Sequence, residues 1–359
     1  MTTFALVGFG FRAEAFFRVA RALDDVVCVG AVVREPGRRV LPVPAFGDLT
    51  ACVREARPDF LITGVPRAAT PAIVAEAVAQ GLPVLAETPP APDRDGLRAL
   101  WTAVGGSGLV QVAEQYLLMP SHAARLAAVR SGIIGTPTQV QVSSTQQYHA
   151  MSLVRGFLGV GHEPAAVRAV RTVAPLLNPL DRGGWTDTDQ PEPATTTIAT
   201  LDFGRGRSGL YDFTSNQTRN LLRFRRLLVR GTHGELQDDE IVHMPAPRTI
   251  ARTPLSRRQS GHDLDLNGLD TETITLDGEV LHRNPYVGSR FNDDEIATAA
   301  LLEAMAAWVR GEGPPPYPLA EGAQDHLLAL AVDQAAETGR EIITSVEAWS
   351  LEFPSGTTS

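Results

Sequence analysis

The sequence contains no lysine, because the 32 residues counted as lysine plus arginine are all arginine. A mechanism that needs a lysine ammonium or a lysine Schiff base is therefore excluded. Cysteine is almost absent as well, since Cys28 and Cys52 are the only two. So few thiols do not make a disulfide framework or a thiolate metal site, and we expect the protein to work in a reducing cytoplasm.

Long apolar runs are also missing, and no basic segment precedes the short first apolar run. We therefore expect neither a membrane span nor a targeting signal. A net charge of -9 and a pI near 5.4 argue against a nucleic acid or an anionic membrane as partner. The eight histidines have no metal-ligand spacing, so no metal is predicted. The sequence has neither a Gly-x-Ser-x-Gly elbow nor a phosphate-binding Gly-Lys-Ser/Thr loop, which leaves hydrolase and kinase functions without support.

A glycine-rich stretch near the N-terminus is the most informative motif. An apolar run from Phe4 passes into Gly8-x-Gly10-x-x-Ala13 and then into helix-forming sequence. This order predicts the strand, turn and helix of a dinucleotide-binding unit, in which the first helical amides hold the diphosphate. A purely structural glycine turn is the alternative. The candidate cofactor contacts are Gly8, Phe9, Gly10, Phe11 and Arg12.

Strands and helices alternate up to residue 118. The chain of 359 residues is long enough for about two domains, and the alternation predicts a doubly wound parallel sheet, the Rossmann arrangement, in residues 1–118. Ligands of such sheets bind beyond the carboxyl ends of the strands. The residues expected at that edge are Arg34, Arg38, Gly64, Val65, Pro66, Glu87, Thr88, Glu114, Gln115 and Tyr116.

The loop after the second expected strand carries Arg34, Arg38 and Arg39. NAD-binding proteins usually have an acidic residue here that binds the ribose, whereas arginine suits the 2′-phosphate of NADP. NADP(H) is therefore favoured over NAD(H). The alternative is that these arginines are only solvated side chains of a polar loop.

From residue 119 the pattern changes to that of an α+β domain, which we place at 119–353, followed by a disordered tail at 354–359. Alternating polar and apolar residues predict a mostly antiparallel open sheet with strands at 136–147, 195–203, 208–215 and 223–231. Helices are expected at 121–131, 148–158, 292–310 and 319–339. Proline, glycine and aspartate predict irregular structure at 178–193 and 247–270.

Several motifs together resemble those of one family. They are the glycine stretch, Val65-Pro66, Glu87-Thr88-Pro89, Gly132-Ile-Ile-Gly135 and a helix with His149. Over nearly the whole chain the layout resembles the glucose-fructose oxidoreductase, inositol dehydrogenase and rhizopine-catabolism (Gfo/Idh/MocA) family. The resemblance implies a Rossmann domain, a substrate domain whose open sheet forms a homodimer or homotetramer, and an NAD(P)-dependent oxidoreductase. Its substrate would be a carbonyl or secondary alcohol of a sugar, cyclitol or related small polar metabolite.

Two catalytic positions implied by the resemblance are different here. Thr88 stands where the family has the lysine of Glu-Lys-Pro, and Thr145 where it has the carboxylate of Asp-x-x-x-His. His149 matches the catalytic histidine and is the expected proton-transfer group, because imidazole titrates near neutral pH. A helix-start histidine satisfied by the backbone is the alternative. Tyr148 and Tyr116 are possible helpers, and Thr88 is expected to contact the substrate.

The remaining candidates extend this site. Glu87 and Gln115 are expected at the cofactor, Glu87 at the nicotinamide ribose. Substrate contacts are expected from Glu114, Tyr116, His149, Asp212 and Gln217. For the acidic residues at strand ends, simple solvation is the alternative. Besides the oxidoreductase, two functions stay open: an imine-type reductase, whose weaker proton demands would tolerate the missing lysine, and a non-redox NAD(P)-binding protein that has lost the chemistry.

Overall fold

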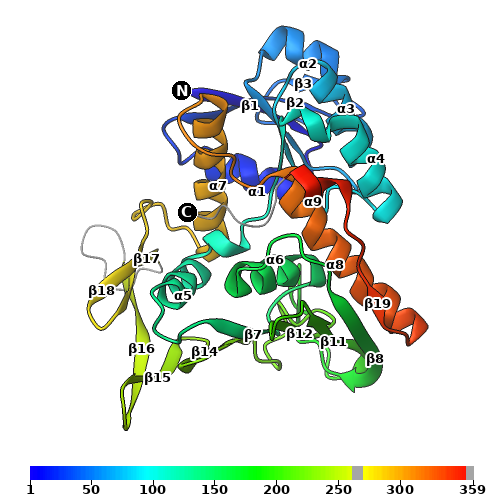
Figure 1. Ribbon diagram of the computed structural model, residues 1–359. Coiled ribbons are helices and arrows are strands. Elements are labelled where there is room, and N and C mark those ends of the chain that lie inside the picture. Colours follow the sequence, from blue (N-terminus) through cyan, green and yellow to red (C-terminus); the bar gives the residue numbers. More distant parts are fainter. Residues whose placement is uncertain (261–269, 353–359) are drawn as a thin grey trace.

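The computed structural model describes residues 1–260 and 270–352, which form two large sheets with helices packed on them and one small two-stranded sheet (Figure 1). The first sheet has six parallel strands in the order β3-β2-β1-β4-β5-β6. Its strands are β1 (Thr2–Val7), β2 (Val26–Val32), β3 (Ala45–Phe46), β4 (Phe60–Thr63), β5 (Val84–Ala86) and β6 (Val110–Val112). The connecting helices are α1 (Phe11–Ala20), α2 (Leu49–Ala56), α3 (Thr70–Ala79) and α4 (Arg94–Val104). This doubly wound order confirms the predicted Rossmann sheet. From β1 the strands follow in chain order to β3 on one side and from β4 to β6 on the other, and such sheets bind ligands at the point between β1 and β4 where this order changes direction.

The second sheet has eleven strands in the order β18-β17-β16-β15-β14-β13-β7-β12-β11-β8-β19. Every neighbouring pair is antiparallel except β7 with β12, so the predicted mostly antiparallel sheet is confirmed. Its first strands are β7 (Pro137–Val142), β8 (Ala166–Leu176), β11 (Glu192–Asp202), β12 (Ser208–Thr214), β13 (Leu227–Gly231) and β14 (Gly234–Gln237). The others are β15 (Glu240–Ala246), β16 (Thr249–Ser260), β17 (Asp270–Leu276), β18 (Glu279–Arg283) and β19 (Ile342–Ile343).

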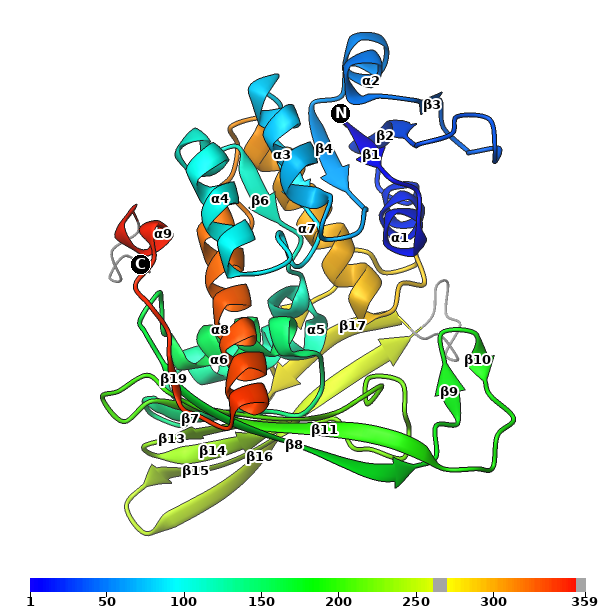
Figure 2. The ribbon, with the colours of Figure 1, turned by 90° about the vertical axis from the view of Figure 1, so that its right-hand side faces the viewer.

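Helices cover one face of this large sheet and leave the other bare (Figure 2). They are α5 (Pro120–Arg130), α6 (Gln147–Leu158) and α8 (Leu319–Thr338), while α7 (Asp293–Val309) packs against α1 and the first sheet. Alternate strand residues such as Ala199 and Tyr211 are buried beneath them, whereas Val170 and Ile198 on the bare face are 58% and 41% exposed. The period of two along each strand therefore separates a helix-covered face from an open one.

One predicted irregular segment is wrong. Residues 249–260 form β16, which pairs with β15 and β17, although the whole stretch 247–270 was expected to be irregular. Thr253 and Leu255 are buried while Arg252 and Pro254 between them are exposed, so the segment has the alternation of a half-buried strand. Its proline and arginines conceal this pattern in the sequence.

Other boundaries differ less. The strand predicted at 223–231 begins only at Leu227, and that at 136–147 ends at Val142. Segment 178–193 is irregular as expected apart from the start of β11 and a small hairpin of β9 (Leu180–Asp181) and β10 (Gly184–Trp185). The tail predicted at 354–359 lies outside the described residues. No described helix is long and apolar enough to cross a membrane.

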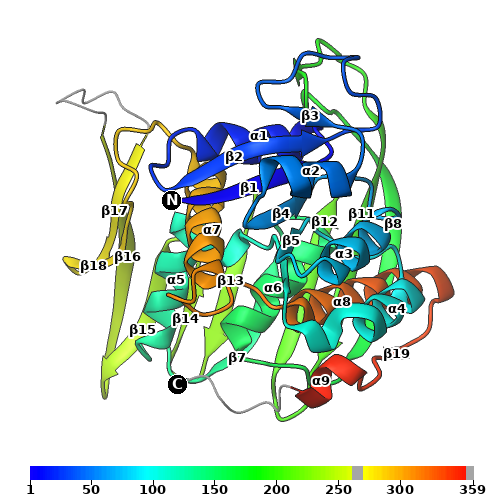
Figure 3. The same ribbon diagram turned by 90° about the horizontal axis from the view of Figure 1, so that it is seen from above.

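Late helices contribute to the core around the first sheet. In α7, Leu301 and Met305 are fully buried in one cluster with Phe4 and Phe16. The first half of α8 joins a second cluster on that sheet, where Leu327 is fully buried, and α8 lies beside α4 (Figure 3). The second half of α8 packs instead into the core of the large sheet. The boundary predicted between residues 118 and 119 stays a prediction.

Trp349 gives a test of this packing. It lies in α9 (Ala348–Glu352), is fully buried, stands edge-on to Trp101 at 6.2 Å, and donates from Nε1 to Gln324 Oε1 at 3.0 Å. Trp349→Ala should lower the free energy of unfolding by about 3–5 kcal/mol, because it leaves a large cavity. Denaturant titration measures the change. Trp185→Ala is the matched control: this tryptophan is 73% exposed, and its loss should change the stability by less than about 0.5 kcal/mol.

Candidate active site

The glycine turn between β1 and α1 is tightly packed at Gly8 and open at Gly10. Gly8 has φ +89°, and a Cβ added there would lie 2.6 Å from the carbonyl oxygen of Gly64. A Cβ on Gly64 would in turn lie 2.9 Å from Cβ of Ala13. Gly10 precedes α1 without a side-chain cap, and a Cβ there would meet nothing within 4 Å. The first amides of α1 therefore have room to bind an anion.

The loop Gly64–Pro66 lies beside this turn, as the sequence predicted. The side chain of Val65 would lie 3.1 Å from a Cβ on Gly8, and Pro66 accepts a backbone hydrogen bond from Ala69 at the start of α3. Phe11, the first residue of α1, is 68% exposed. Phe9 instead packs against Phe17 with ring centroids 5.9 Å apart.

Arg12 connects the turn to two other elements. Its Nε lies 3.2 Å from Glu87 Oε1 at the end of β5, and its Nη1 lies 3.2 Å from Asp294 Oδ2 in the first turn of α7. Asp294 Oδ1 accepts a hydrogen bond of 2.8 Å from Gln115 Nε2. Sequence reasoning did not identify Asp294, because nothing in its local pattern distinguishes it from an ordinary acidic residue at a helix start.

Three buried polar atoms of this ion-pair cluster have no hydrogen-bond partner among the described residues. They are Nη2 of Arg12, Oε2 of Glu87 and Oε1 of Gln115. Burial raises the pKa of Glu87 to about 7, although the nearby Arg12 and His149 oppose the rise. Buried donors and acceptors without a hydrogen-bond partner are typical of sites that bind a polar ligand.

A buried carboxylate holds His149 in place. Glu114, whose side chain is fully buried, accepts from His149 Nδ1 through Oε2 at 2.7 Å and from the Tyr116 amide through Oε1 at 3.0 Å. His149 lies in the first turn of α6 and is 19% exposed. No described residue bonds to its Nε2. Glu114 is therefore the carboxylate partner of His149 in this chain, where the family resemblance implies a carboxylate at position 145.

Two tyrosines pack against this histidine. Tyr116, which follows β6, stacks on the imidazole with ring centroids 4.2 Å apart, and burial raises its pKa. Tyr148 meets the same ring edge-on at 5.5 Å. Its hydroxyl lies near α8, because a Cβ on Gly322 would be 3.0 Å from it, and burial raises its pKa well above the usual value. Tyr116 is thus the closer neighbour of the imidazole face.

The two threonines at the changed positions differ in their surroundings. Thr88 is half-buried between Glu87 and Pro89, and its peptide bond to Pro89 is cis. Thr145 is 1% exposed, and its side chain lies beside that of Tyr116. Thr145 belongs to the loop just before α6, the helix that carries His149.

The arginines after β2 are exposed. Arg38 pairs with Glu35 at 3.4 Å, and Arg39 pairs with Glu14 at 2.6 Å. Arg34 has no ion-pair partner among residues 1–260 and 270–352. It is therefore the arginine of this loop that is free to bind a ligand.

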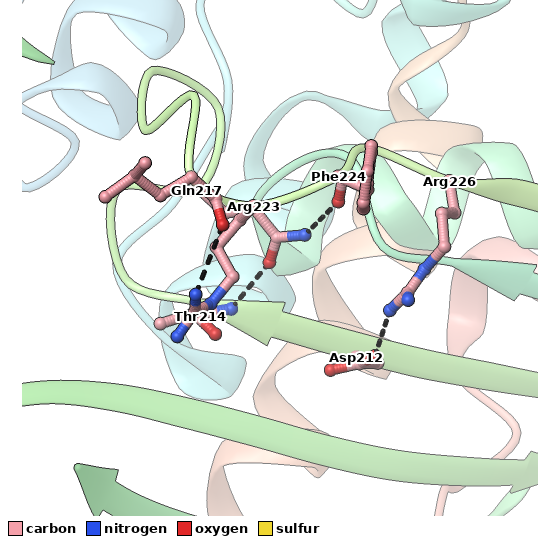
Figure 4. A pocket seen from close by; sticks show the side chains of 7 residues that line it. Asp212, Thr214, Gln217, Arg223, Phe224 and Arg226 are labelled. Carbon is pink, nitrogen blue, oxygen red and sulfur yellow. Dashed lines mark hydrogen bonds and ion pairs between the residues drawn. The ribbon is translucent and has the colours of Figure 1, made fainter. Parts of the chain in front are cut away.

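Asp212 and Gln217 are the two predicted substrate contacts that come from β12 and the loop after it. They line a separate cavity of about 380 Å³ at the end of β12 (Figure 4). Asp212 accepts from Arg226 at 2.7 Å, and Gln217 bonds to the backbone of Thr214 and Phe224. In the part of the chain that the structure describes, neither contacts Glu87, Glu114 or His149. Both residues also bond to Ser143 in the segment before α6: Ser143 Oγ donates to Asp212 Oδ2 at 3.4 Å, and Gln217 Nε2 donates to Ser143 O at 2.8 Å. Their predicted contact with a substrate stays a prediction.

No protein-family model matches the sequence, and no curated protein matches it. Solved structures share its fold over nearly the whole chain. An oxidoreductase from Agrobacterium radiobacter, in complex with NAD+, L-tartaric acid and magnesium, is 16% identical with a TM-score of 0.68, covering 95% of this chain and 98% of that one. A myo-inositol dehydrogenase from Corynebacterium glutamicum is 18% identical with a TM-score of 0.65, covering 96% and 99%.

A levoglucosan dehydrogenase, in complex with NADH and levoglucosan, is 17% identical with a TM-score of 0.66 and covers 96% and 99% of the two chains. At these identities the likeness establishes a shared fold. The fold is thus that of NAD-binding dehydrogenases, the kind of protein that the sequence motifs resemble.

The raised pKa of Glu87 predicts how stability depends on pH. Burial raises this pKa from 4.5 to about 7, so between these values the folded chain keeps a proton that the unfolded chain releases. Stability should therefore fall as pH rises through this range and then level off. Glu87→Gln should make the decrease smaller in thermal melts between pH 4.5 and 8. Some dependence of stability on pH should remain in Glu87→Gln, because burial also raises the pKa of Asp325 to about 7. An unchanged dependence in Glu87→Gln would contradict the prediction.

Proposed function

We propose that this protein is an NAD(P)-dependent oxidoreductase that prefers NADP(H). It transfers hydride to or from a carbonyl or secondary alcohol of a sugar, a cyclitol or a related small polar metabolite. The observation that carries the proposal is the pair of Glu114 and His149, which lies at the carboxyl edge of the first sheet beside the residues that contact Arg12. The shared fold with NAD-binding dehydrogenases supports it.

The residues around the glycine turn fit a dinucleotide. The uncapped start of α1 and the open space over Gly10 suit a diphosphate. Arg34, exposed at the end of β2, suits a 2′-phosphate, and Glu87 suits the nicotinamide ribose. Once bound, the nicotinamide would supply or accept the hydride, which leaves the protein to orient the substrate and move one proton.

His149 is the group proposed to move that proton. A carboxylate that accepts from Nδ1 fixes the neutral imidazole with its proton on that nitrogen, which leaves the lone pair of Nε2 available. In the oxidation direction Nε2 takes the alcohol proton, and in the reduction direction protonated His149 returns it to the new alkoxide. The retained pair of carboxylate and imidazole favours this function over the non-redox alternative, which would not require it.

Arg12 and Thr88 complete the proposed surroundings. With no lysine in the chain, Arg12 is the cation that acts on both Glu87 and Glu114. Its positive charge favours an oxygen that gains negative charge during the reaction. Thr88 is proposed to contact the substrate hydroxyl, and Tyr116 to shield one face of the imidazole.

Self-association is part of the same proposal. The bare face of the large sheet carries exposed Val170 and Ile198 next to polar residues such as Thr200. Two such faces would exclude water from their apolar side chains by packing together. We propose that a homodimer or homotetramer forms through this sheet.

Cofactor preference can be measured directly. Arg34→Asp should weaken NADPH binding about tenfold or more, because it removes a charged partner of the 2′-phosphate, while NADH binding changes little. Calorimetric titration with both dinucleotides gives the dissociation constants. Arg130→Asp, at the exposed end of α5, is the matched control for the change in charge. If the wild-type protein binds neither dinucleotide, the proposed function is wrong.

Turnover tests the pair of Glu114 and His149. His149→Ala should reduce kcat about 10²–10⁴-fold, because it removes the general acid and base. Dinucleotide affinity should stay nearly the same, since the residue lies on α6. Glu114→Gln should give a smaller loss and shift the pH profile of kcat. The measurement is nicotinamide absorbance with a panel of polyols and their ketones.

The same panel decides between this assignment and its competitors. Normal turnover in His149→Ala would assign the proton to another group, and Tyr116→Phe and Tyr148→Phe would then identify it. A gain of sugar dehydrogenase activity in Thr88→Lys, in a protein otherwise inactive, would favour the non-redox alternative.

A further inference from the structure

A small hairpin stands apart from both main sheets. Strands β9 and β10 form a separate two-stranded sheet within the connection from β8 to β11. Figure 2 shows it at the end of the large sheet, directed toward α1. The hairpin belongs to the segment that the sequence marked as irregular, and the proposed function gives it no part.

Hydrogen bonds fix the base of this hairpin. Thr186 donates from its amide to Pro179 O at 3.0 Å and from its hydroxyl to Asn178 O at 2.7 Å. Asn216, in the turn after β12, donates from Nδ2 to Asn178 Oδ1 at 2.6 Å and to Leu180 O at 2.8 Å. Thr186 thus joins the two sides of the hairpin base, and Asn216 joins the first side to the turn after β12.

The tip reaches the glycine turn. The Arg182 guanidinium carbon lies 5.5 Å from the ring centroid of Phe11, the first residue of α1. This is the range of a cation–π contact. Asp181, the neighbouring carboxylate, instead accepts from the Gly183 amide at 2.6 Å. Arg182 pairs with no carboxylate among residues 1–260 and 270–352, so its charge is available to a ligand.

We propose that Arg182 binds the diphosphate of the dinucleotide from the side opposite the glycine turn. This inference rests on the proposed function and adds a cation from the second domain to it. The amides at the start of α1 and the guanidinium over Phe11 would then face the same anion from two elements. The charge of the ligand explains why an unpaired arginine is held at an uncapped helix start.

The position of Arg182 selects the diphosphate over the other phosphate. The 2′-phosphate site proposed above lies at the end of β2, with Arg34, whereas Phe11 follows Gly10 directly at the diphosphate end of the turn. Both dinucleotides carry the same diphosphate. Loss of Arg182 must therefore weaken NADH and NADPH equally, unlike loss of Arg34.

Fluorescence titration of NADH and NADPH against the full-length protein tests this assignment. Arg182→Ala should raise both dissociation constants about tenfold, because an exposed charge-assisted contact to phosphate is lost. Arg182→Lys should keep part of the affinity, since an ammonium still attracts the diphosphate. Raising the salt concentration should reduce the difference between wild type and Arg182→Ala.

Controls separate binding from folding. Arg130→Ala removes the same charge far from the turn and should leave both dissociation constants unchanged. The melting temperature of Arg182→Ala without ligand should stay close to that of the wild type, because the side chain makes no hydrogen bond or ion pair among the described residues and loses only an exposed cation–π contact with Phe11.

Three results would overturn the inference. Unchanged dissociation constants for both dinucleotides would show that Arg182 does not bind the ligand. Weaker binding of NADPH alone would assign Arg182 to the 2′-phosphate instead. Failure of the wild-type protein to bind either dinucleotide would remove the proposed function and this inference with it, whereas the first two results leave that function standing.

Discussion

A carboxylate without solvent contact must find hydrogen-bond donors, and Glu114 finds them in the His149 ring and the Tyr116 amide. Glu114 comes just after β6 of the first sheet, whereas His149 belongs to the helix that covers the second. Satisfying one buried charge thus fixes the imidazole relative to the strand edge. The remaining features of the site, from the stacked Tyr116 to the free Nε2, depend on this contact.

The cluster around Arg12 places the glycine turn in the same way. Arg12 and its partner Asp294 are separated by 282 positions, yet their ion pair joins the start of α1 to the start of α7. Glu87 joins the end of β5 to the same guanidinium. Charges that are partly shielded from water are costly to leave unpaired, so each partner restrains the other two. The proposed cofactor site and proton-transfer site are therefore held at one edge by opposite charges.

Local patterns predict much of this molecule. The Gly8 turn, the alternation of strands and helices and the edge that collects Glu87, Glu114 and Gln115 all follow from short stretches of sequence, because parallel strands end at a common edge. The partner of His149 does not, since Glu114 is 35 positions away and meets it only through packing. The substrate contacts expected from Asp212 and Gln217 stay a prediction, because proximity to a strand end does not say whether a side chain is already satisfied by its own loop.

The division of α8 between two cores has a consequence for how the protein unfolds. Leu327 packs with the first sheet and Val332 with the second, so the two hydrophobic clusters share one continuous helix. Opening either cluster would expose apolar side chains of a helix that also packs in the other cluster. Because of this shared helix, we expect the two halves of the chain to unfold in a single cooperative transition in place of two separate ones.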